Sequence, residues 1–267
     1  MGDSTTNSDS AYESLYAELI KHSYYYAMVP GNHDSYKPSV QRKTMTQIPD
    51  AHFAPKSAAC YFDDHLHSIR FICLNTHEKG SDLVQNKAIT DYGWSGFGYG
   101  QYNWLANEAL KTTYKVVLLS HTSFAKTGGG WSLTSHSNYL TVKTLIDAFV
   151  DGSSGTIQLT LESDEADAET TINYDFSNQG MGKIVLFHGH THGDFPLNDS
   201  ENTYSKWLEI WVDNALCDNS NFAGHDNVKT RNTPTEIAFD VVTIDCTNNK
   251  IYCHRFGAGA DRTLTFI

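Results

Sequence analysis

The chain of 267 residues is long enough for one large α/β domain with a buried core, and we expect a single domain over residues 1–267. Its net charge of −12 argues against non-specific binding to nucleic acid or to an anionic membrane, because the mean electrostatic field repels phosphate. No apolar run approaches the roughly 20 residues that span a bilayer, and the first ten residues lack the basic and apolar regions of a signal peptide. We therefore expect a soluble chain, whose cellular compartment the sequence leaves open.

Short apolar runs alternate with amphipathic segments along the chain. The runs are rich in β-branched or aromatic residues, which is typical of strands covered on both faces. A capping box of Ser10 with Glu13 predicts where the first helix begins. In chain order we expect a helix at 10–20, strands at 24–29 and 69–75, a helix at 101–111, a strand at 115–120, a helix at 138–150, a strand at 183–188, a helix at 205–216, a hairpin at 237–256 and a last strand at 264–267. This alternation predicts βαβ units and an α/β class with a mixed sheet system.

Two segments interrupt this pattern. Residues near 156–177 alternate apolar and polar positions on both sides of an acidic turn, which predicts a surface hairpin insertion. Calcium binding by Asp164, Glu165 and Asp167 is an alternative, although their spacing is not that of an EF-hand loop. Residues 218–236 are polar and rich in Gly and Asn, which indicates a long loop near the binding site.

The five cysteines form an odd and sparse set without C-x-x-C spacing. This usage indicates neither a disulfide framework nor a zinc knuckle. One alternative is a disulfide between Cys246 and Cys253, which could face each other across the turn of the predicted C-terminal hairpin.

Polar clusters stand where three of the predicted strands end. In an open α/β sheet the carboxyl ends of the strands meet at one crevice, so residues distant in sequence come together there. Neutral imidazoles with amide or carboxylate oxygens suit Mn, Fe or Zn ions held with open positions. The clustered residues are Asn32, His33, Asp34, His121, His188, His190 and His192.

Each of these residues also has an ordinary structural explanation. A single His after a strand, such as His121, is often a hydrogen-bonded interior residue, and Asn32 follows Pro-Gly as a common turn former. His190 and His192 are two residues apart behind Gly189, which allows close approach of the backbone and lets both rings reach one centre. Coincidence in all three clusters is a weaker explanation than a shared metal site.

These residues carry a resemblance to a known family. The stretch 31–34 (Gly-Asn-His-Asp), then His121, then 189–192 (Gly-His-Thr-His) resemble, in order and in strand-end placement, the later signature blocks of the calcineurin-like metallophosphoesterases. The segments around 101–121 and 238–262 are also similar to that superfamily, so the resemblance covers nearly the whole chain. It implies an α/β sandwich of two mixed sheets flanked by helices, and it says little about the substrate.

The opening Gly2-Asp3 also resembles a family block. In the family a Gly-Asp, whose Asp bridges two metals, precedes the Gly-Asn-His block by about one helix and one strand, and Gly2 stands 29 residues before Gly31. The family's earlier Asp-x-His block is absent. The pairs at 50–52 and 63–65 have its spacing, but neither follows a buried strand, so we reject both. We therefore expect an N-terminally truncated fold that begins upstream of Met1.

The resemblance also implies a role for each matching residue. One metal would be bound by the set Asp3, Asn32, His121 and His190, and a second by Asp3 and His192 with two ligands missing. His33 would bind no metal and would act as general acid, with Asp34 orienting its ring. His188 matches no ligand of the family, and we expect it either to support the ligands from behind or to be a packed interior residue, while Asp194 would orient His192 from behind. At most one tightly bound divalent metal and reduced activity are the consequences we expect.

The resulting prediction is metal-dependent hydrolysis of a phosphate mono- or diester by a metal-activated water. An impaired phosphoesterase-like binding domain is the alternative; the missing Asp-x-His block favours it, whereas the retained His33 and Asp34 favour the enzyme. A solitary structural metal is a third reading, and it would need a closed four-ligand site. We expect a small phosphate-ester substrate and no nucleic acid, membrane or obligate protein partner, since no basic stripe or base-stacking platform is evident.

Overall fold

The structure is a computed structural model that describes part of the chain. The described residues are 14, 17–19, 21–22, 25–31, 46–55, 57–77, 96–123, 139–159, 171–179, 184–190, 207–212 and 228–265. Within these ranges no helix combines the length and the apolar character that a membrane crossing requires.

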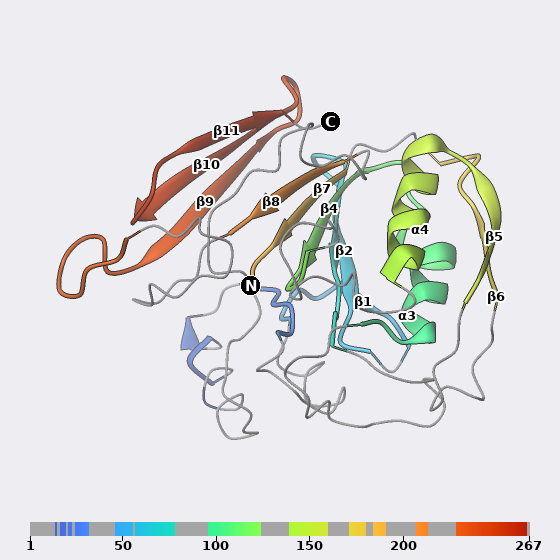
Figure 1. Ribbon diagram of the computed structural model, residues 1–267, viewed down its shortest axis with the longest axis horizontal. Helices are drawn as coiled ribbons and strands as arrows, with labels where there is room; N and C mark the ends of the chain where they lie inside the picture. Colours follow the sequence, from blue (N-terminus) through green and yellow to red (C-terminus); the bar gives the residue numbers. More distant parts are fainter. Residues whose placement is uncertain are drawn as a thin grey trace.

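A six-stranded mixed sheet forms the centre of the molecule, with the strand order β1-β2-β3-β4-β7-β8 (Figure 1). Its strands are β1 (His52–Phe53), β2 (Cys60–Asp64), β3 (Ile69–Cys73), β4 (Lys115–Ser120), β7 (Ile184–His188) and β8 (Leu208–Trp211). β1, β2 and β3 pair antiparallel, whereas β3, β4, β7 and β8 pair parallel. The predicted strands at 69–75, 115–120 and 183–188 are thus confirmed as β3, β4 and β7.

Helices cover one face of this sheet. α3 (Tyr99–Trp104) continues directly into the π-helical turn η1 (Leu105–Ala109), and α4 (Tyr139–Asp151) lies beside it (Figure 1). Both helices correspond to predicted helical segments. Their apolar side chains pack against alternate residues of the parallel strands, including Leu118 and Leu186, which are fully buried. β5 (Ser154–Gln158) and β6 (Thr171–Asp175) pair antiparallel beyond the helices, as expected for a hairpin.

A three-stranded antiparallel sheet covers the opposite face. It consists of β9 (Ala238–Asp245), β10 (Lys250–Gly257) and β11 (Arg262–Thr265) in the order β11-β10-β9. Ile251 and Cys253 of β10 pack against Val117 and Val185, which point away from the helices. The two sheets therefore form a sandwich with helices outside it, and the predicted hairpin at 237–256 is confirmed.

The prediction of a helix at 205–216 is wrong, because its described part forms β8. Leu208 and Ile210 pack toward the three-stranded sheet, while Trp207 packs on the helix side. Residues of a strand alternate between faces, and pairing with β7 buries the segment on both sides. This tertiary pairing overrides the helical spacing of its apolar residues. The run at 24–29 also differs from its prediction, since its described part makes only an isolated bridge, between Ala27 and Thr46.

The alternative of a disulfide between Cys246 and Cys253 is wrong as well. Cys60, Cys73, Cys246 and Cys253 are free thiols. In the register of the C-terminal hairpin Cys253 lies opposite Val242, while Cys246 is beyond the end of β9, so these two residues do not face each other.

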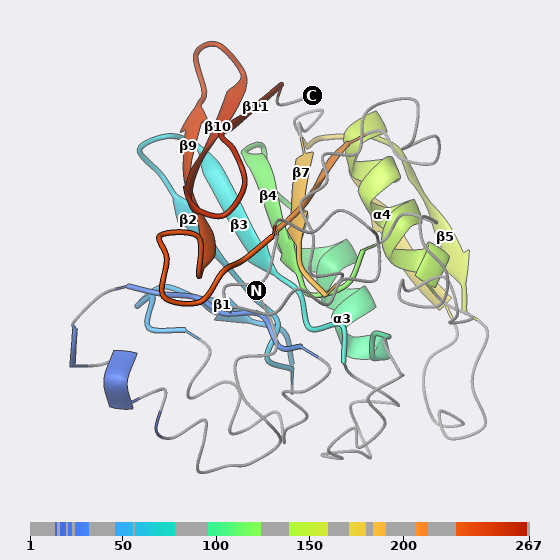
Figure 2. The same ribbon diagram turned by 60° about the vertical axis from the view of Figure 1, so that its left-hand side comes forward.

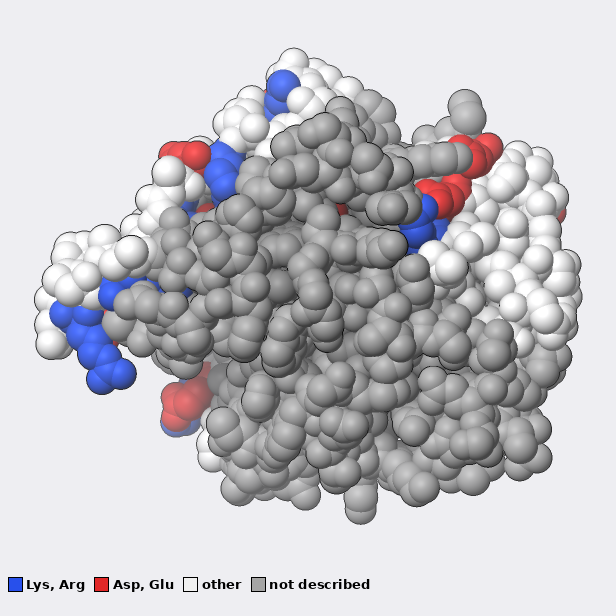
Figure 3. All heavy atoms as spheres, viewed as in Figure 1, with Lys and Arg blue, Asp and Glu red and all other residues white. Residues whose placement is uncertain are grey.

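Positive charges on the described surface are dispersed. On the face in Figure 3 the described Lys and Arg side chains lie in several separate places, with Asp or Glu beside some of them. Arg255 and Arg262 both pair with Asp240, and Arg70 pairs with Asp63. These guanidinium groups are therefore already held in ion pairs with carboxylates within the protein.

Candidate metal centre

The parallel strands of the central sheet end at a common edge, and polar residues follow three of them. β3, β4 and β7 run side by side in the same direction (Figure 2). His77 lies beyond the end of β3, His121 directly follows β4, and His190 lies two residues after the end of β7. Strand direction alone therefore brings three histidines from distant parts of the chain to one edge of the sheet.

His121 and His190 form the centre of this group. Nδ1 of His190 lies 3.0 Å from Nε2 of His121, and the ring centroids are 4.8 Å apart. Both residues are buried, with 1% and 8% of their surface exposed. The Gly189 backbone N–H donates a hydrogen bond of 3.1 Å to the His121 carbonyl, which joins the two loops next to the rings.

The backbone of His190 has a φ of 70°, in the left-handed region that few residues other than glycine adopt. The structure thus places the unusual conformation at the histidine itself rather than at the preceding Gly189. Such a conformation costs free energy and persists where the surroundings fix it. The ring of this residue lies beside that of His121.

The separation of the two ring nitrogens fits a shared metal ion. Ligand bonds of about 2.0–2.1 Å that meet at about 90–110° place two imidazole nitrogens roughly 2.9–3.4 Å apart. The 3.0 Å observed between His121 and His190 lies in this range. Within the described ranges no three His, Cys, Asp or Glu side chains gather closely enough to hold a metal. The remaining predicted site residues lie outside the described residues: Asp3, Asn32, His33, Asp34, His192 and Asp194.

His77 belongs to this edge and was missed by the sequence analysis. Its ring centroid is 5.6 Å from that of His121, and it is 6% exposed. Gln101 of α3 fixes the His77 loop, because its side chain bonds both the N–H and the carbonyl of Asn75, at 2.9 and 2.8 Å. The signal was present in the sequence, since the polar stretch 75–77 follows an apolar strand in the same way as His121 does.

A second group of polar side chains lies next to the segments that carry these two histidines. Nε2 of His188 is 3.0 Å from Oε1 of Glu209, and neither side chain is exposed. The Ser123 hydroxyl donates a short hydrogen bond to the same carboxylate oxygen. The prediction placed His188 behind the metal site, but Glu209 was missed because it falls in the segment predicted as a helix.

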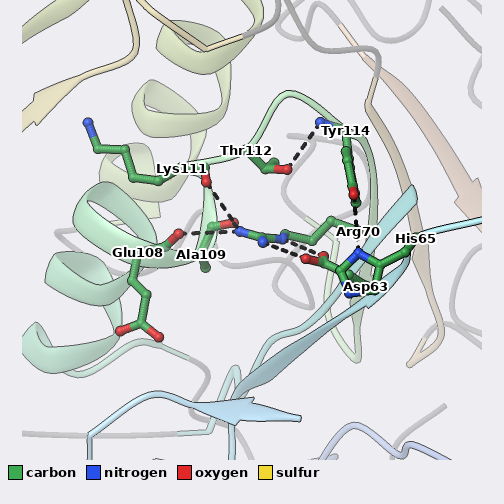
Figure 4. A network of polar contacts seen from close by, with 8 residues as sticks. All are labelled: Asp63, His65, Arg70, Glu108, Ala109, Lys111, Thr112 and Tyr114. Atoms are coloured by element: carbon green, nitrogen blue, oxygen red, sulfur yellow. Dashed lines mark hydrogen bonds and ion pairs between the residues drawn. The ribbon is translucent and has the colours of Figure 1, made fainter. Parts of the chain in front are cut away.

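The rejected Asp-x-His pairs have other partners. Asp63 forms an ion pair with Arg70, and Nδ1 of His65 lies 3.1 Å from the Tyr114 hydroxyl (Figure 4). His52 stacks on Tyr61. Asp64, next to Asp63, pairs with Ile69, which in turn aligns with Lys115 at the start of β4. At about 3.3 Å per residue, Lys115 is roughly 16–17 Å from Ser120, where β4 ends and the candidate metal centre begins.

Three comparisons with known proteins bear on this arrangement. The sequence model of the calcineurin-like phosphoesterase family matches residues 1–194. A crystal structure of a dimetal phosphatase from Danio rerio has a similar fold, with a TM-score of 0.54 and 14% sequence identity over 97% of this chain and 78% of the other. A comparison with curated protein sequences found no match.

Proposed function

The chain belongs to the calcineurin-like phosphoesterases, and from this we propose that it hydrolyses a phosphate mono- or diester in a reaction that depends on a divalent metal. The observation that carries the proposal is the convergence of His121 and His190, whose ring nitrogens lie 3.0 Å apart at the carboxyl edge of the sheet. Divalent metals in such sites acidify water and offset the negative charge of a phosphate ester.

The chain's own residues hold the metal in this proposal. His121 and His190 supply neutral imidazole nitrogens, which suit Mn, Fe or Zn. Asp3 and Asn32 complete the ligand set of this metal, and Asp3 with His192 would contribute to a second metal position, as the family motifs imply. Carboxylate and amide oxygens beside imidazoles make a mixed N/O site, which favours these metals over Ca²⁺ with its all-oxygen preference.

His33 is the proposed general acid. It matches no ligand position of the family motif, so its imidazole is available to donate a proton to the leaving oxygen of the ester. The role proposed for Asp34, as the family motif implies, is to accept a hydrogen bond from the other ring nitrogen, which would fix the tautomer and the orientation of the ring.

A small phosphate ester is the proposed substrate. The net charge of −12 disfavours a polyanion, and the buried side chains of Arg255 and Arg262 are held in ion pairs with Asp240 within the protein. A local site whose charge comes from bound metal still attracts a single phosphate group.

The test is hydrolysis of p-nitrophenyl phosphate and bis(p-nitrophenyl) phosphate by chelator-treated protein before and after Mn²⁺, Fe²⁺ or Zn²⁺ is restored. We expect activity only after metal is added, and none in the double variant His121→Ala/His190→Ala purified in the same way. That variant controls for contaminating phosphatases. Activity that survives chelation, or that is equal in the double variant, would refute the proposal.

A further inference from the structure

The buried group formed by Ser123, His188 and Glu209 has no part in the proposed reaction. Glu209 and His188 are completely buried, and Ser123 is 3% exposed. A single oxygen, Oε1 of Glu209, receives the Ser123 hydroxyl and lies 3.0 Å from Nε2 of His188. We refer to these three residues as the carboxylate clamp.

Burying the carboxylate of the clamp costs folding free energy. Residues of β8 alternate in direction, so Glu209 points to the helix side of the sheet, where Leu118, Leu186 and Trp207 form an apolar core. A buried carboxylate loses its hydration and recovers this loss only through well-placed partners. Apolar side chains of similar volume are often neutral or stabilising in such positions. The position of the clamp therefore points to a role other than stability.

Each member of the carboxylate clamp is next to a metal-binding loop. Ser123 lies two residues after His121, His188 lies two residues before His190, and Glu209 belongs to the neighbouring strand β8. Backbone hydrogen bonds connect the same three segments. Gly189 N–H donates to the His121 carbonyl at 3.1 Å, and Val212 N–H donates to the His188 carbonyl at 2.8 Å. The clamp therefore connects the loops after β4 and β7 to each other and to β8.

The strained backbone at His190 requires such support. Its φ of 70° is unfavourable for a residue with a Cβ. A metal site binds tightly when its ligands are already held in the bound geometry by the residues behind them. If the carboxylate clamp were released, the His190 loop would be free to relax, and its ring would leave His121.

We propose that Glu209 is a positioning residue that, through His188 and Ser123, holds the His121 and His190 rings so that they converge on one divalent metal. This inference rests on the proposed function, because it assumes that these two rings bind metal. In this inference Glu209 acts through the two loops that carry these rings.

The test compares Co²⁺ binding by the full chain and its variants, using the visible absorption of the bound ion as a readout of its coordination. Glu209→Gln keeps the shape of the side chain but removes its charge. Ser123→Ala removes one hydrogen bond and leaves the carboxylate in place. Asp63→Asn is the matched control, since it removes a carboxylate from the ion pair with Arg70 at the far end of the sheet.

We expect Glu209→Gln to weaken Co²⁺ binding by roughly 10- to 100-fold, the usual effect of a residue behind the ligands, and to change the absorption bands. Ser123→Ala should also weaken Co²⁺ binding and change the absorption bands in the same direction, but by smaller amounts. Asp63→Asn should lower the melting temperature and leave affinity and spectrum unchanged. If Glu209→Gln does not fold, Ser123→Ala decides the question.

Two results would overturn the inference. If Glu209→Gln and Ser123→Ala bind Co²⁺ with the affinity and spectrum of the wild type and lose only thermal stability, as Asp63→Asn does, the carboxylate clamp is structural. If the wild type itself binds no Co²⁺, the proposed metal centre fails, and this inference fails with it. The first result leaves the proposed function standing, so the two failures are distinguishable.

Discussion

Removing the Arg70 guanidinium should destabilise the fold strongly without affecting the metal centre. Nε and Nη2 of Arg70 each lie 2.7 Å from an oxygen of Asp63, in a two-pronged ion pair (Figure 4). Nη1 donates a 3.0 Å hydrogen bond to the Ala109 carbonyl at the end of η1. The guanidinium carbon also stands 3.9 Å above the ring of Tyr61. One side chain thereby joins β2, β3 and the end of the helix.

The expected cost follows from these contacts. Arg70→Ala leaves the Asp63 carboxylate without its partner, and breaking a buried pair costs about 3–5 kcal/mol. The two side chains are 10% and 15% exposed, so water reaches the carboxylate and the lower end applies. Loss of the contact with Tyr61 adds roughly 0.5–1 kcal/mol. The sum is about 3–4 kcal/mol, a large part of the 5–15 kcal/mol that stabilises a typical protein.

The assay is urea denaturation of the wild type, Arg70→Ala and Arg70→Lys, followed by fluorescence. Lys keeps the charge but lacks the second donor of the ion pair, so Arg70→Lys should fall between the other two. Co²⁺ affinity should be the same in all three, because Arg70 lies near the start of β3 and the metal centre beyond its other end. If Arg70→Ala lowered the free energy of unfolding by less than about 1 kcal/mol, the usual value of an exposed pair, the Arg70–Asp63 pair would not act as a buried one.

Three further predictions concern single side chains. His33→Ala should lower kcat by roughly 10²- to 10⁴-fold with metal content unchanged; a variant that loses its metal would show that His33 is a ligand. His121→Ala should lose metal affinity by far more than His188→Ala, for which roughly 10- to 100-fold is expected, and equal losses in a metal titration would contradict this distinction. A hydrogen bond with Cys60 and burial raise the pKa of the Cys73 thiol, so mass spectrometry should find Cys73 unalkylated in the native protein at neutral pH while half-buried Cys246 reacts; early labelling of Cys73 would be inconsistent with this packing.

The sequence predicted the parts of the fold that follow from local patterns. β3, β4 and β7 are short apolar runs buried on both faces, and β9 and β10 flank a polar turn, so their composition and spacing were informative. The placement of His121 and His190 followed from the rule that parallel strands end at one edge. These conclusions needed no knowledge of packing.

The parts that could not be predicted depend on tertiary pairing. β8 carries apolar residues at a spacing that also suits a helix, and only its pairing with β7 decides between the two. Glu209 was missed for the same reason, because a Glu within a predicted helix does not indicate a buried polar group. The positive φ of His190 could not be predicted either, because the neighbouring Gly189 is the residue at which the sequence would place such a conformation.

In the proposed function, His121 and His190 bind one divalent metal on which hydrolysis depends. The most direct test of this proposal is equilibrium dialysis of the wild type and of His121→Ala/His190→Ala against Mn²⁺ or Zn²⁺, with activity measured on the same samples. We predict that activity rises with bound metal in the wild type, and that the double variant, although folded by circular dichroism, binds neither metal tightly and is inactive. A folded double variant that retains wild-type metal content and activity would contradict the account.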